Sequence, residues 1–336
     1  MVMASTHLVA RHQVVRARTR TGGVGVWPDP PGRQFSVCAS DGVRLAVREW
    51  GDPDSPICIV LSHGWTLSSR LWVRQIGVLS RDARVIAYDH RGHGASGRGL
   101  SGSCTLDQLG RDLGDVIDGV APEGQIVLAG HSMGGMTIMH LAKQRPDLFA
   151  HRVDGVVIVS SSAGELGSSD LGLPGLFGHL VRGCGPRAMA ALGHLEAWAE
   201  RRETLGPELW LAVRALAFGP GATAHLVDEM VSVAKATPLG VVSAFYAALA
   251  QHDGRSGLRV LQHTPTTILV GTEDRLTPLS HSLRLAAALP HAELVRLEGA
   301  GHMLTLERPA EVAGAIGRYI KPFSEATEAG DFLVAP

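Results

Sequence analysis

Apolar residues along the chain fall into two kinds of pattern, and both predict β-strands. Val43, Leu45 and Val47 recur at every second position directly after the turn dipeptide Asp41-Gly42, which is typical of a β-hairpin that here begins near Phe35. The other pattern is a short, continuous apolar run bounded by turn residues, which is typical of a parallel strand buried on both faces. Such runs occupy residues 57–61, 85–87, 126–129, 156–159 and 268–270, and a last strand-like run occupies residues 292–297.

Segments of helical length separate these runs. Because strand and helix alternate, the sequence predicts an α/β fold, in which a mostly parallel sheet carries helices on both faces. The expected helices span residues 71–79, 106–120, 133–144, 279–288 and 310–320.

The alternation is broken once, between residues 164 and 251. This stretch has helical periodicity without a strand-like run. Open α/β sheets bind ligands at the carboxyl ends of their strands, so we expect residues 164–251 to form a helical cap, or lid, folded over that edge. The stretch also holds many of the aromatic residues of the chain, namely Phe177, Trp198, Trp210, Phe218, Phe245 and Tyr246.

The remaining segments complete the predicted domain organisation. Residues 34–163 and 252–322 form the core domain, and residues 323–336 form a C-terminal tail. Residues 1–33 are an extension with several arginines and a Gly/Pro-rich stretch at 22–32 that should not hold regular structure. A flexible tail is the simplest interpretation of the extension, and an arm that binds a partner or touches a membrane is the alternative.

Composition narrows the classes of function. With 45% hydrophobic and 19% charged residues the chain has a globular composition, and its formal net charge of -1 gives no net field that would attract nucleic acid. No apolar run reaches the roughly 18 residues of a transmembrane span, and the N-terminus lacks the apolar segment of a signal peptide. The four cysteines form no CxxC pair, so no metal site is predicted. We expect a cytoplasmic protein that acts on a small molecule.

The strongest chemical signal is Gly130-His131-Ser132-Met133-Gly134, between a predicted strand and a predicted helix. A serine on a sharp strand-to-helix turn is exposed above the sheet, and glycines on either side remove the Cβ atoms that would clash there. The context therefore predicts Ser132 as a nucleophile. An ordinary turn serine is the structural alternative.

A serine hydroxyl needs a general base, and His302 is the candidate among 16 histidines. It follows the run at 292–297, in a glycine-rich loop that emerges at the same sheet edge as Ser132. His131 lies next to the nucleophile, so its side chain should point away. His90 and His93 lie in a glycine-rich turn and are more simply structural.

The base needs an orienting acid, and Asp274 lies a few residues beyond the strand at 268–270. Glu273 is the obvious competitor, and a residue just after the strand at 156–159 is another. The order along the chain is then Ser, Asp, His. The backbone N–H groups of Trp65 and Met133 are the expected donors to the oxyanion of an acyl-transfer intermediate. His63, Trp198 and Trp210 are candidate residues of the substrate pocket.

Taken together, residues 35–320 resemble the α/β-hydrolase superfamily, in its branch of capped esterases and lipases. The resemblance implies a cofactor-independent serine hydrolase with Ser132, Asp274 and His302 as its triad and Trp65 and Met133 at its oxyanion hole. It rests on His63-Gly64, the segment from Asp89 to Ser96, the motif around Ser132, Gly271-Thr272-Glu273-Asp274, Gly301-His302 and Glu307-Arg308-Pro309.

One fold hosts many reactions, and the nucleophile narrows them. Epoxide hydrolases and haloalkane dehalogenases of this fold carry an aspartate where this chain has Ser132. Hydrolysis of carboxylic esters with apolar acyl groups, such as monoacylglycerols, is therefore the leading expectation. Hydrolysis of C–C bonds, thioesters, lactones or amides and cofactor-free perhydrolysis are alternatives on the same triad. A catalytically silent, ligand-binding member of the fold is the alternative outside enzymes.

Overall fold

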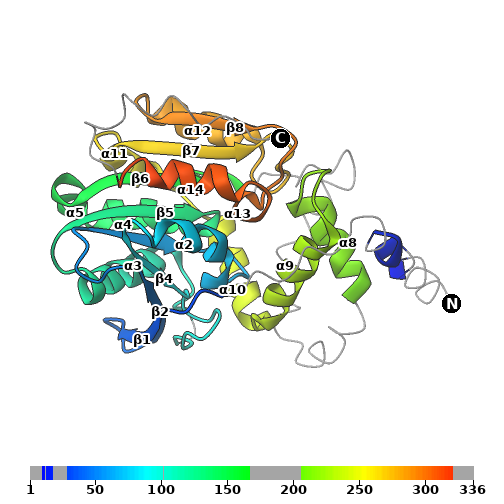
Figure 1. Ribbon diagram of the computed structural model, residues 1–336, viewed down its shortest axis with the longest axis horizontal. Helices are drawn as coiled ribbons and strands as arrows, with labels where there is room; N and C mark the ends of the chain where they lie inside the picture. The colour runs from blue at the N-terminus through cyan, green and yellow to red at the C-terminus, as the bar shows by residue number, and fades with distance from the viewer. Residues whose placement is uncertain (1–9, 12, 18–28, 101, 167–205, 321–336) are drawn as a thin grey trace.

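The computed structural model describes residues 10–11, 13–17, 29–100, 102–166 and 206–320. Eight strands form one sheet in the order β1-β2-β4-β3-β5-β6-β7-β8 (Figure 1). β1 pairs antiparallel with β2 and β2 pairs antiparallel with β4, whereas the other five pairings are parallel. The strands are β1 (Arg33–Cys38), β2 (Arg44–Trp50), β3 (Ile57–Ser62), β4 (Arg84–Tyr88), β5 (Gln125–His131), β6 (Val153–Val159), β7 (Thr266–Gly271) and β8 (Glu293–Leu297).

Helices follow most of the parallel strands. The helices of the core are η1 (Ser69–Trp72), α2 (Val73–Leu79), α3 (Leu106–Val120), α4 (Met133–Gln144), α5 (Pro146–His151), α11 (Arg255–Leu261), α12 (Leu279–Ala288), α13 (Leu304–Glu307) and α14 (Pro309–Gly317). Those at 106–120, 133–144 and 279–288 match the prediction residue for residue. The predicted helix at 71–79 is a 3₁₀ turn followed by α2. The one at 310–320 begins one residue earlier, with Pro309 in its first turn, and ends at Gly317.

Alternation along the buried strands divides the core into two layers. Ile59, Leu61, Val127 and Ala129 belong to one apolar cluster with residues of α2 and α14. The residues between them face the other way and pack with α3, α4, α11 and α12. Because successive side chains of a strand point to opposite faces, a continuous apolar run can serve both layers. The predicted α/β fold, a mostly parallel sheet with helices on both faces, is confirmed.

A helical insertion separates β6 from β7. Its described helices are α8 (Gly206–Ala217), α9 (Ala224–Ala236) and α10 (Leu239–Ala250). α8 and α9 lie beyond the carboxyl ends of the parallel strands (Figure 1). The two ends of the insertion meet, since Gly164 and Asp253 form an antiparallel bridge. We use "insertion" below for residues 164–251.

A short helix lies within the predicted N-terminal extension. Residues 10, 11 and 13–17 are helical, and this helix lies beside α8 (Figure 1). Ala10, Val14 and Ala17 recur at helical spacing and share one face. Val14 is buried in the same apolar cluster as Trp210. This contact with the cluster favours helical structure in residues 10–11 and 13–17.

Within the described part of the chain, no single helix has the length and apolar character to cross a membrane. α9 and α10 meet those criteria only as a pair, with a bend of 100° between them.

Candidate active site

Ser132 forms the turn between β5 and α4. Its backbone has φ 53° and ψ -116°, a region that residues with a Cβ rarely adopt. The strain is held by packing and by a hydrogen bond from Ser132 N to the carbonyl oxygen of Val159, 2.9 Å away. Ser132 is partly exposed, while its neighbours His131 and Met133 are buried. The turn therefore presents one hydroxyl at the carboxyl edge of the sheet.

Glycines beside Ser132 make this turn possible. A Cβ at Gly134 would collide with the carbonyl oxygen of Ser62 on β3, and one at Gly130 would lie 2.5 Å from the backbone of Gly134. Both positions therefore need glycine because another segment of backbone occupies the space of a side chain. The close approach brings the start of α4 beside the end of β3.

Asp274 and His302 meet at the same edge of the sheet. Asp274 lies three residues beyond β7, and His302 lies in the loop between β8 and α13. His302 Nδ1 is 2.9 Å from Asp274 Oδ2, and both side chains are buried. A carboxylate only accepts, so Nδ1 carries the proton and Nε2 is left as the acceptor. This tautomer is the one that a general base next to a serine requires.

Thr277 is a site residue that the sequence interpretation missed. Its hydroxyl lies 2.9 Å from Asp274 Oδ2, and its N–H donates to Asp274 Oδ1 at 2.8 Å. The N–H of Leu276 donates to the same Oδ1 at 2.9 Å. The carboxylate is thus fixed by three donors besides His302. The available signal was the spacing, since a carboxylate often bonds the amides two and three residues further on.

The alternative acids do not share this position. Glu273 is exposed. The residues after β6 are Ser160, Ser161 and Ser162, which carry hydroxyl groups rather than carboxylates. Among the three alternatives weighed from the sequence, only Asp274 has its carboxylate against His302.

His131 brings the loop of His302 next to the serine turn. Its Nε2 lies 3.0 Å from the backbone oxygen of His302, and the two rings are 4.9 Å apart between centroids. Burial lowers the pKa of His131 to about 3. The ring is therefore neutral, and its N–H donates to a carbonyl group. His131 connects two loops instead of serving as the base.

The backbone N–H groups of Met133, which follows Ser132, and of Trp65, whose side chain packs against the cluster of Met133, are the predicted oxyanion donors. Over residues 29–100, 102–166 and 206–320, neither Trp65 nor Met133 donates its backbone N–H to a protein acceptor. Met133 begins α4, whose N-terminus carries partial positive charge. Trp65 follows β3, and the next residue, Thr66, has a φ of 63° and donates its N–H to His93 Nε2 at 3.3 Å. These groups fit the predicted oxyanion donors.

A family model described as "alpha/beta hydrolase fold" matches residues 57–309, which is most of the chain. The chain belongs to the alpha/beta hydrolase fold family.

Individual relatives of this hydrolase agree with the family. It is 28% identical over 256 residues to "Putative carbamate hydrolase RutD" of Pseudomonas savastanoi pv. phaseolicola, covering 76% of this chain and 90% of the relative. A thermophilic esterase from Thermogutta terrifontis has a similar structure, with a TM-score of 0.66, 22% identity and coverage of 86% of this chain and 98% of the esterase. An enol-lactonase from Burkholderia xenovorans LB400 has a TM-score of 0.68 at 22% identity, and the match covers 85% of this chain and 99% of the enol-lactonase. The two structures support the fold, and the family supports hydrolase activity.

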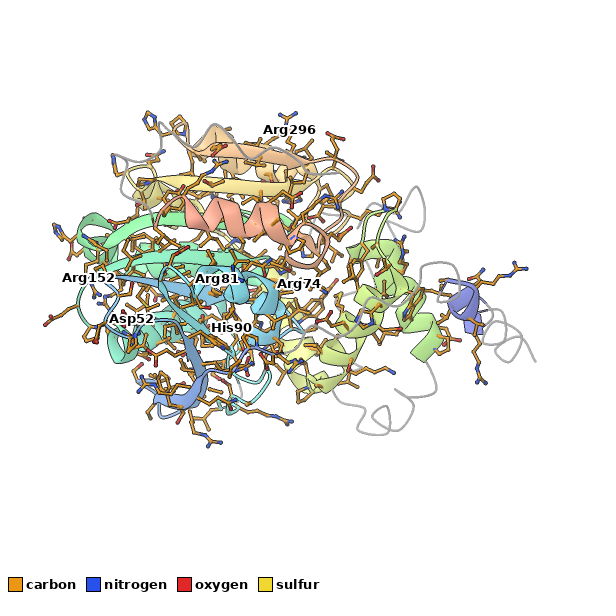
Figure 2. The ribbon with its side chains drawn as sticks, in the orientation of Figure 1. Asp52, Arg74, Arg81, His90, Arg152 and Arg296 are labelled. Carbon is orange, nitrogen blue, oxygen red and sulfur yellow. The ribbon has the colours of Figure 1, made fainter. Side chains whose placement is uncertain are left out.

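Helices of the insertion contact the core of the hydrolase close to these loops. The indole N–H of Trp65 donates to the backbone oxygen of Val242 on α10 at 3.2 Å. Arg74 of α2 lies at the border between core and insertion (Figure 2) and pairs with Glu229 of α9 at 3.3 Å. α10 thus holds the loop that carries one candidate oxyanion donor.

His63, predicted as a pocket residue, is fully buried and bonded to the backbone at both ring nitrogens. Nε2 accepts the N–H of His90 at 2.9 Å, so Nδ1 carries the proton toward the oxygen of Gly64 at 2.7 Å. Burial lowers the pKa of His63. His90, in the interior (Figure 2), and His93 also have their pKa values lowered by burial. The three rings pack edge-on against one another beneath the Trp65 loop.

The two candidate tryptophans of the cap have different positions. Trp210 lies on α8 with 3% of its surface exposed, and its indole N–H donates to Asp228 Oδ1 of α9 at 2.8 Å. It therefore ties α8 to α9. Trp198 lies outside the described residues.

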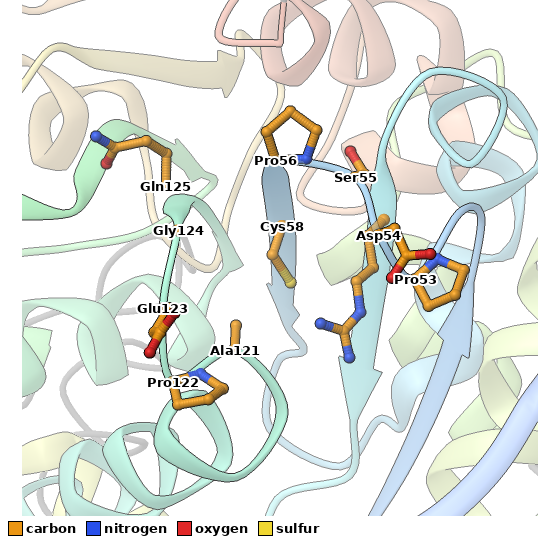
Figure 3. A pocket seen from close by; sticks show the side chains of 11 residues that line it. Pro53, Asp54, Ser55, Pro56, Cys58, Ala121, Pro122, Glu123, Gly124 and Gln125 are labelled. Carbon is orange, nitrogen blue, oxygen red and sulfur yellow. The ribbon is translucent and has the colours of Figure 1, made fainter.

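A hollow at the opposite end of the sheet has no such chemistry. It is lined by the loops that precede β3 and β5 and by Cys58 and Arg84 (Figure 3). Burial raises the pKa of the Cys58 thiol to about 11, which keeps the thiol protonated and unreactive. In the described part of the chain no group of three His, Cys, Asp or Glu residues is arranged to hold a metal ion.

Proposed function

We propose that this hydrolase cleaves carboxylic esters of apolar acyl groups through an acyl-enzyme on Ser132. The observation that carries the proposal is the meeting of a strained, partly exposed serine turn with the buried His302–Asp274 pair at one edge of the sheet. A side chain held in a costly backbone conformation is typical of functional sites. The predicted triad accounts for both features.

The proposed reaction proceeds in two halves with His302 moving one proton in each. Ser132 Oγ attacks the ester carbonyl while its proton passes to His302 Nε2, and the backbone N–H groups of Trp65 and Met133 stabilise the oxyanion. His302 then protonates the departing alcohol, which leaves an ester on Ser132. Water attacks that ester by the same route in reverse, releases the acid and restores the serine hydroxyl.

An apolar cluster beside Ser132 supports the choice of acyl group. Met133 and Met136 of α4 pack with Val241 and Phe245 of α10, and Trp65 lies against this cluster. The cluster thus joins the serine turn, the oxyanion loop and the insertion. We propose that residues 164–251 act as a cap and that a substrate's acyl chain occupies an apolar environment next to this cluster. Burial of each methylene favours binding by about 0.8 kcal/mol.

Carbamates are the second candidate substrate, because a relative that covers most of this chain carries that activity in its name. A carbamate has the same carbonyl centre, so the same nucleophile, base and oxyanion donors apply. The apolar cluster favours esters over this alternative. Lactones, thioesters, C–C bonds and perhydrolysis would use the same triad and are distinguished by substrate alone.

A fluorophosphonate probe, followed by mass mapping, tests the nucleophile. Labelling on Ser132 is expected, and a folded but unlabelled protein would favour a silent, ligand-binding member of the fold.

A panel of p-nitrophenyl esters of graded acyl length, with a monoacylglycerol and an aryl carbamate beside them, tests the substrate. Ser132→Ala should abolish turnover and leave the melting temperature close to that of the wild type. Retention of more than about a tenth of the activity would exclude Ser132 as the nucleophile.

A further inference from the structure

The turn that ends α8 is bonded directly to the loop of the candidate base. The backbone oxygen of Ala217 accepts the N–H of His302 at 2.9 Å and the N–H of Met303 at 3.1 Å. Ala217 and Phe218 are both buried. The backbone position of His302 is therefore set by a residue of the insertion, while its ring is set by Asp274 of the core.

Glu307 completes this junction from a third segment. One carboxylate oxygen, Oε2, accepts the N–H of Gly219 at 2.9 Å, and the other, Oε1, accepts the N–H of Gly301 at 3.0 Å. A single side chain thus joins the turn after α8 to the residue just before His302. Burial raises the pKa of Glu307, and the two N–H donors oppose that shift by stabilising the charged form of the carboxylate.

The two segments approach too closely for side chains between them. A Cβ at Gly219 would collide with the backbone oxygen of Gly299, and one at Gly301 would lie 2.5 Å from the N of Gly219. Gly219 is not in the left-handed region of φ. The requirement for glycine at this position therefore comes from the neighbouring loop and not from its own backbone conformation.

We propose that Glu307 and the turn at residues 217–219 are positioning elements that hold His302 in register with Ser132, and that they make the insertion part of the catalytic apparatus. We call residues 217–219, 299–303 and Glu307 the clasp. The inference rests on the proposed function, in which His302 is the base. A base displaced by about 1 Å loses much of its effect, so loosening the clasp slows the chemical step without changing how a small ester binds.

Gly219→Ala tests the clasp with a matched control in the same loop. The new methyl group pushes residues 299–303 away from α8, whereas Gly221→Ala meets no atom within 4 Å. On p-nitrophenyl acetate we expect kcat to fall at least about tenfold in Gly219→Ala, with KM changed by less than about twofold. Gly221→Ala should keep wild-type values. Wild-type kcat in a folded Gly219→Ala variant would overturn the proposal.

Glu307→Gln supplies an independent test that keeps the size of the side chain. Its amide retains one acceptor oxygen, so one of the two N–H groups loses its partner. Glu311→Gln is the control, because Glu311 is exposed on α14 and its ion pair with Arg308 is long, at 3.9 Å. Glu307→Gln should lower kcat in the same way and speed hydrogen exchange at whichever amide, that of Gly219 or that of Gly301, loses its acceptor. Exchange as slow as in the wild type, or an unchanged kcat, would contradict the clasp.

The hydrogen-exchange measurement also separates the two proposals. If the wild-type protein neither hydrolyses esters nor reacts with a fluorophosphonate, the proposed function fails. The exchange rates of Gly219 and Gly301 in Glu307→Gln would still show whether the clasp joins insertion and core. If the wild type hydrolyses esters and Glu307→Gln loses activity while its Gly219 and Gly301 amides exchange as slowly as in the wild type, the proposed function stands and the clasp is refuted.

Discussion

At the scale of single residues, Ser132 occupies a backbone conformation that suits glycine better than serine. Its φ of 53° with ψ of -116° has a cost of about 1–3 kcal/mol for a residue with a Cβ. The surrounding hydrogen bonds and the packing of α4 on β3 maintain it. The conformation that presents the Ser132 hydroxyl therefore lowers the free energy of unfolding.

This strain predicts that Ser132→Gly is more stable than Ser132→Ala. Both variants lack the hydroxyl, but only glycine relieves the strain, and its greater freedom in the unfolded chain offsets part of that gain. We expect the free energy of unfolding to be about 1 kcal/mol higher for Ser132→Gly. Urea titration of both variants measures it. Equal stability would mean that the turn is not strained.

Thr277 carries the second prediction at this scale. Thr277→Val keeps the shape of the buried side chain and removes the hydroxyl that Asp274 Oδ2 accepts. A hydrogen bond to a charged group contributes about 1.5–3 kcal/mol, so we expect kcat/KM to fall about tenfold or more. Thr277→Ser retains the hydroxyl and should stay within about threefold of the wild type. Equal losses in the two variants would assign Thr277 to packing alone.

At the scale of elements, the insertion is joined to the core by a separate contact from each described helix. The end of α8 bonds His302, Glu229 of α9 pairs with Arg74, and Val242 of α10 bonds Trp65. Two of these contacts fall on loops of the candidate site. The packing of α8 on α9, such as the hydrogen bond of Trp210 to Asp228, lies outside these contacts, so it should affect the melting temperature more than the choice of substrate.

Trp210→Phe tests this expectation within the insertion. The change removes the hydrogen bond to Asp228 and part of a buried ring, so we expect a loss of about 1–3 kcal/mol in the free energy of unfolding. The ratio of kcat/KM for octanoate and acetate esters should stay at the wild-type value. A changed ratio with an unchanged melting temperature would instead make Trp210 a pocket residue.

The sequence predicted the bounds of long elements better than those of short elements. α3, α4 and α12 are long enough for periodicity to define both ends. α5, α11 and α13 span seven residues or fewer, so no apolar period identified them. The pairing of His302 with Asp274 followed from strand order, because the carboxyl ends of parallel strands share one edge. Thr277 and the contacts of Glu307 depend on how loops pack, which no local pattern specifies.

At the scale of the whole molecule, several buried histidines are neutral and bonded inside the fold. Burial lowers the pKa of His93 and of His131 to about 3 and that of His252 to about 4. Their unfolded-state pKa is about 6.5. The unfolded chain therefore binds more protons than the folded chain below pH 6.5, and stability falls as pH decreases toward 4.

Acid sensitivity is the matching prediction. Below about pH 6.5, each such histidine lowers the free energy of unfolding by up to about 1.4 kcal/mol for each unit of decrease in pH. Above about pH 7.5 the histidines no longer make stability depend on pH. His252→Gln keeps a donor for the oxygen of Ser162, which His252 Nε2 contacts at 3.0 Å, and should lower the slope by about that amount. His263→Gln, on an exposed residue, should leave the slope unchanged. Urea unfolding from about pH 4.5 to about pH 7.5, which spans the histidine reference pKa of about 6.5, measures the slope of the free energy of unfolding against pH. A flat profile in the wild type would mean that these rings titrate freely.

The bridge between Gly164 and Asp253 affects which insertions and deletions the chain can tolerate during evolution. It holds both ends of the insertion together at the core, so the sheet does not depend on the length of chain between them. Doubling the length of such a closed loop costs only about 0.6 kcal/mol in chain entropy. Lengthening or shortening the chain between these two ends is therefore cheap in chain entropy. The turn at residues 217–219 is the exception, because its spacing from the loop of His302 must stay unchanged.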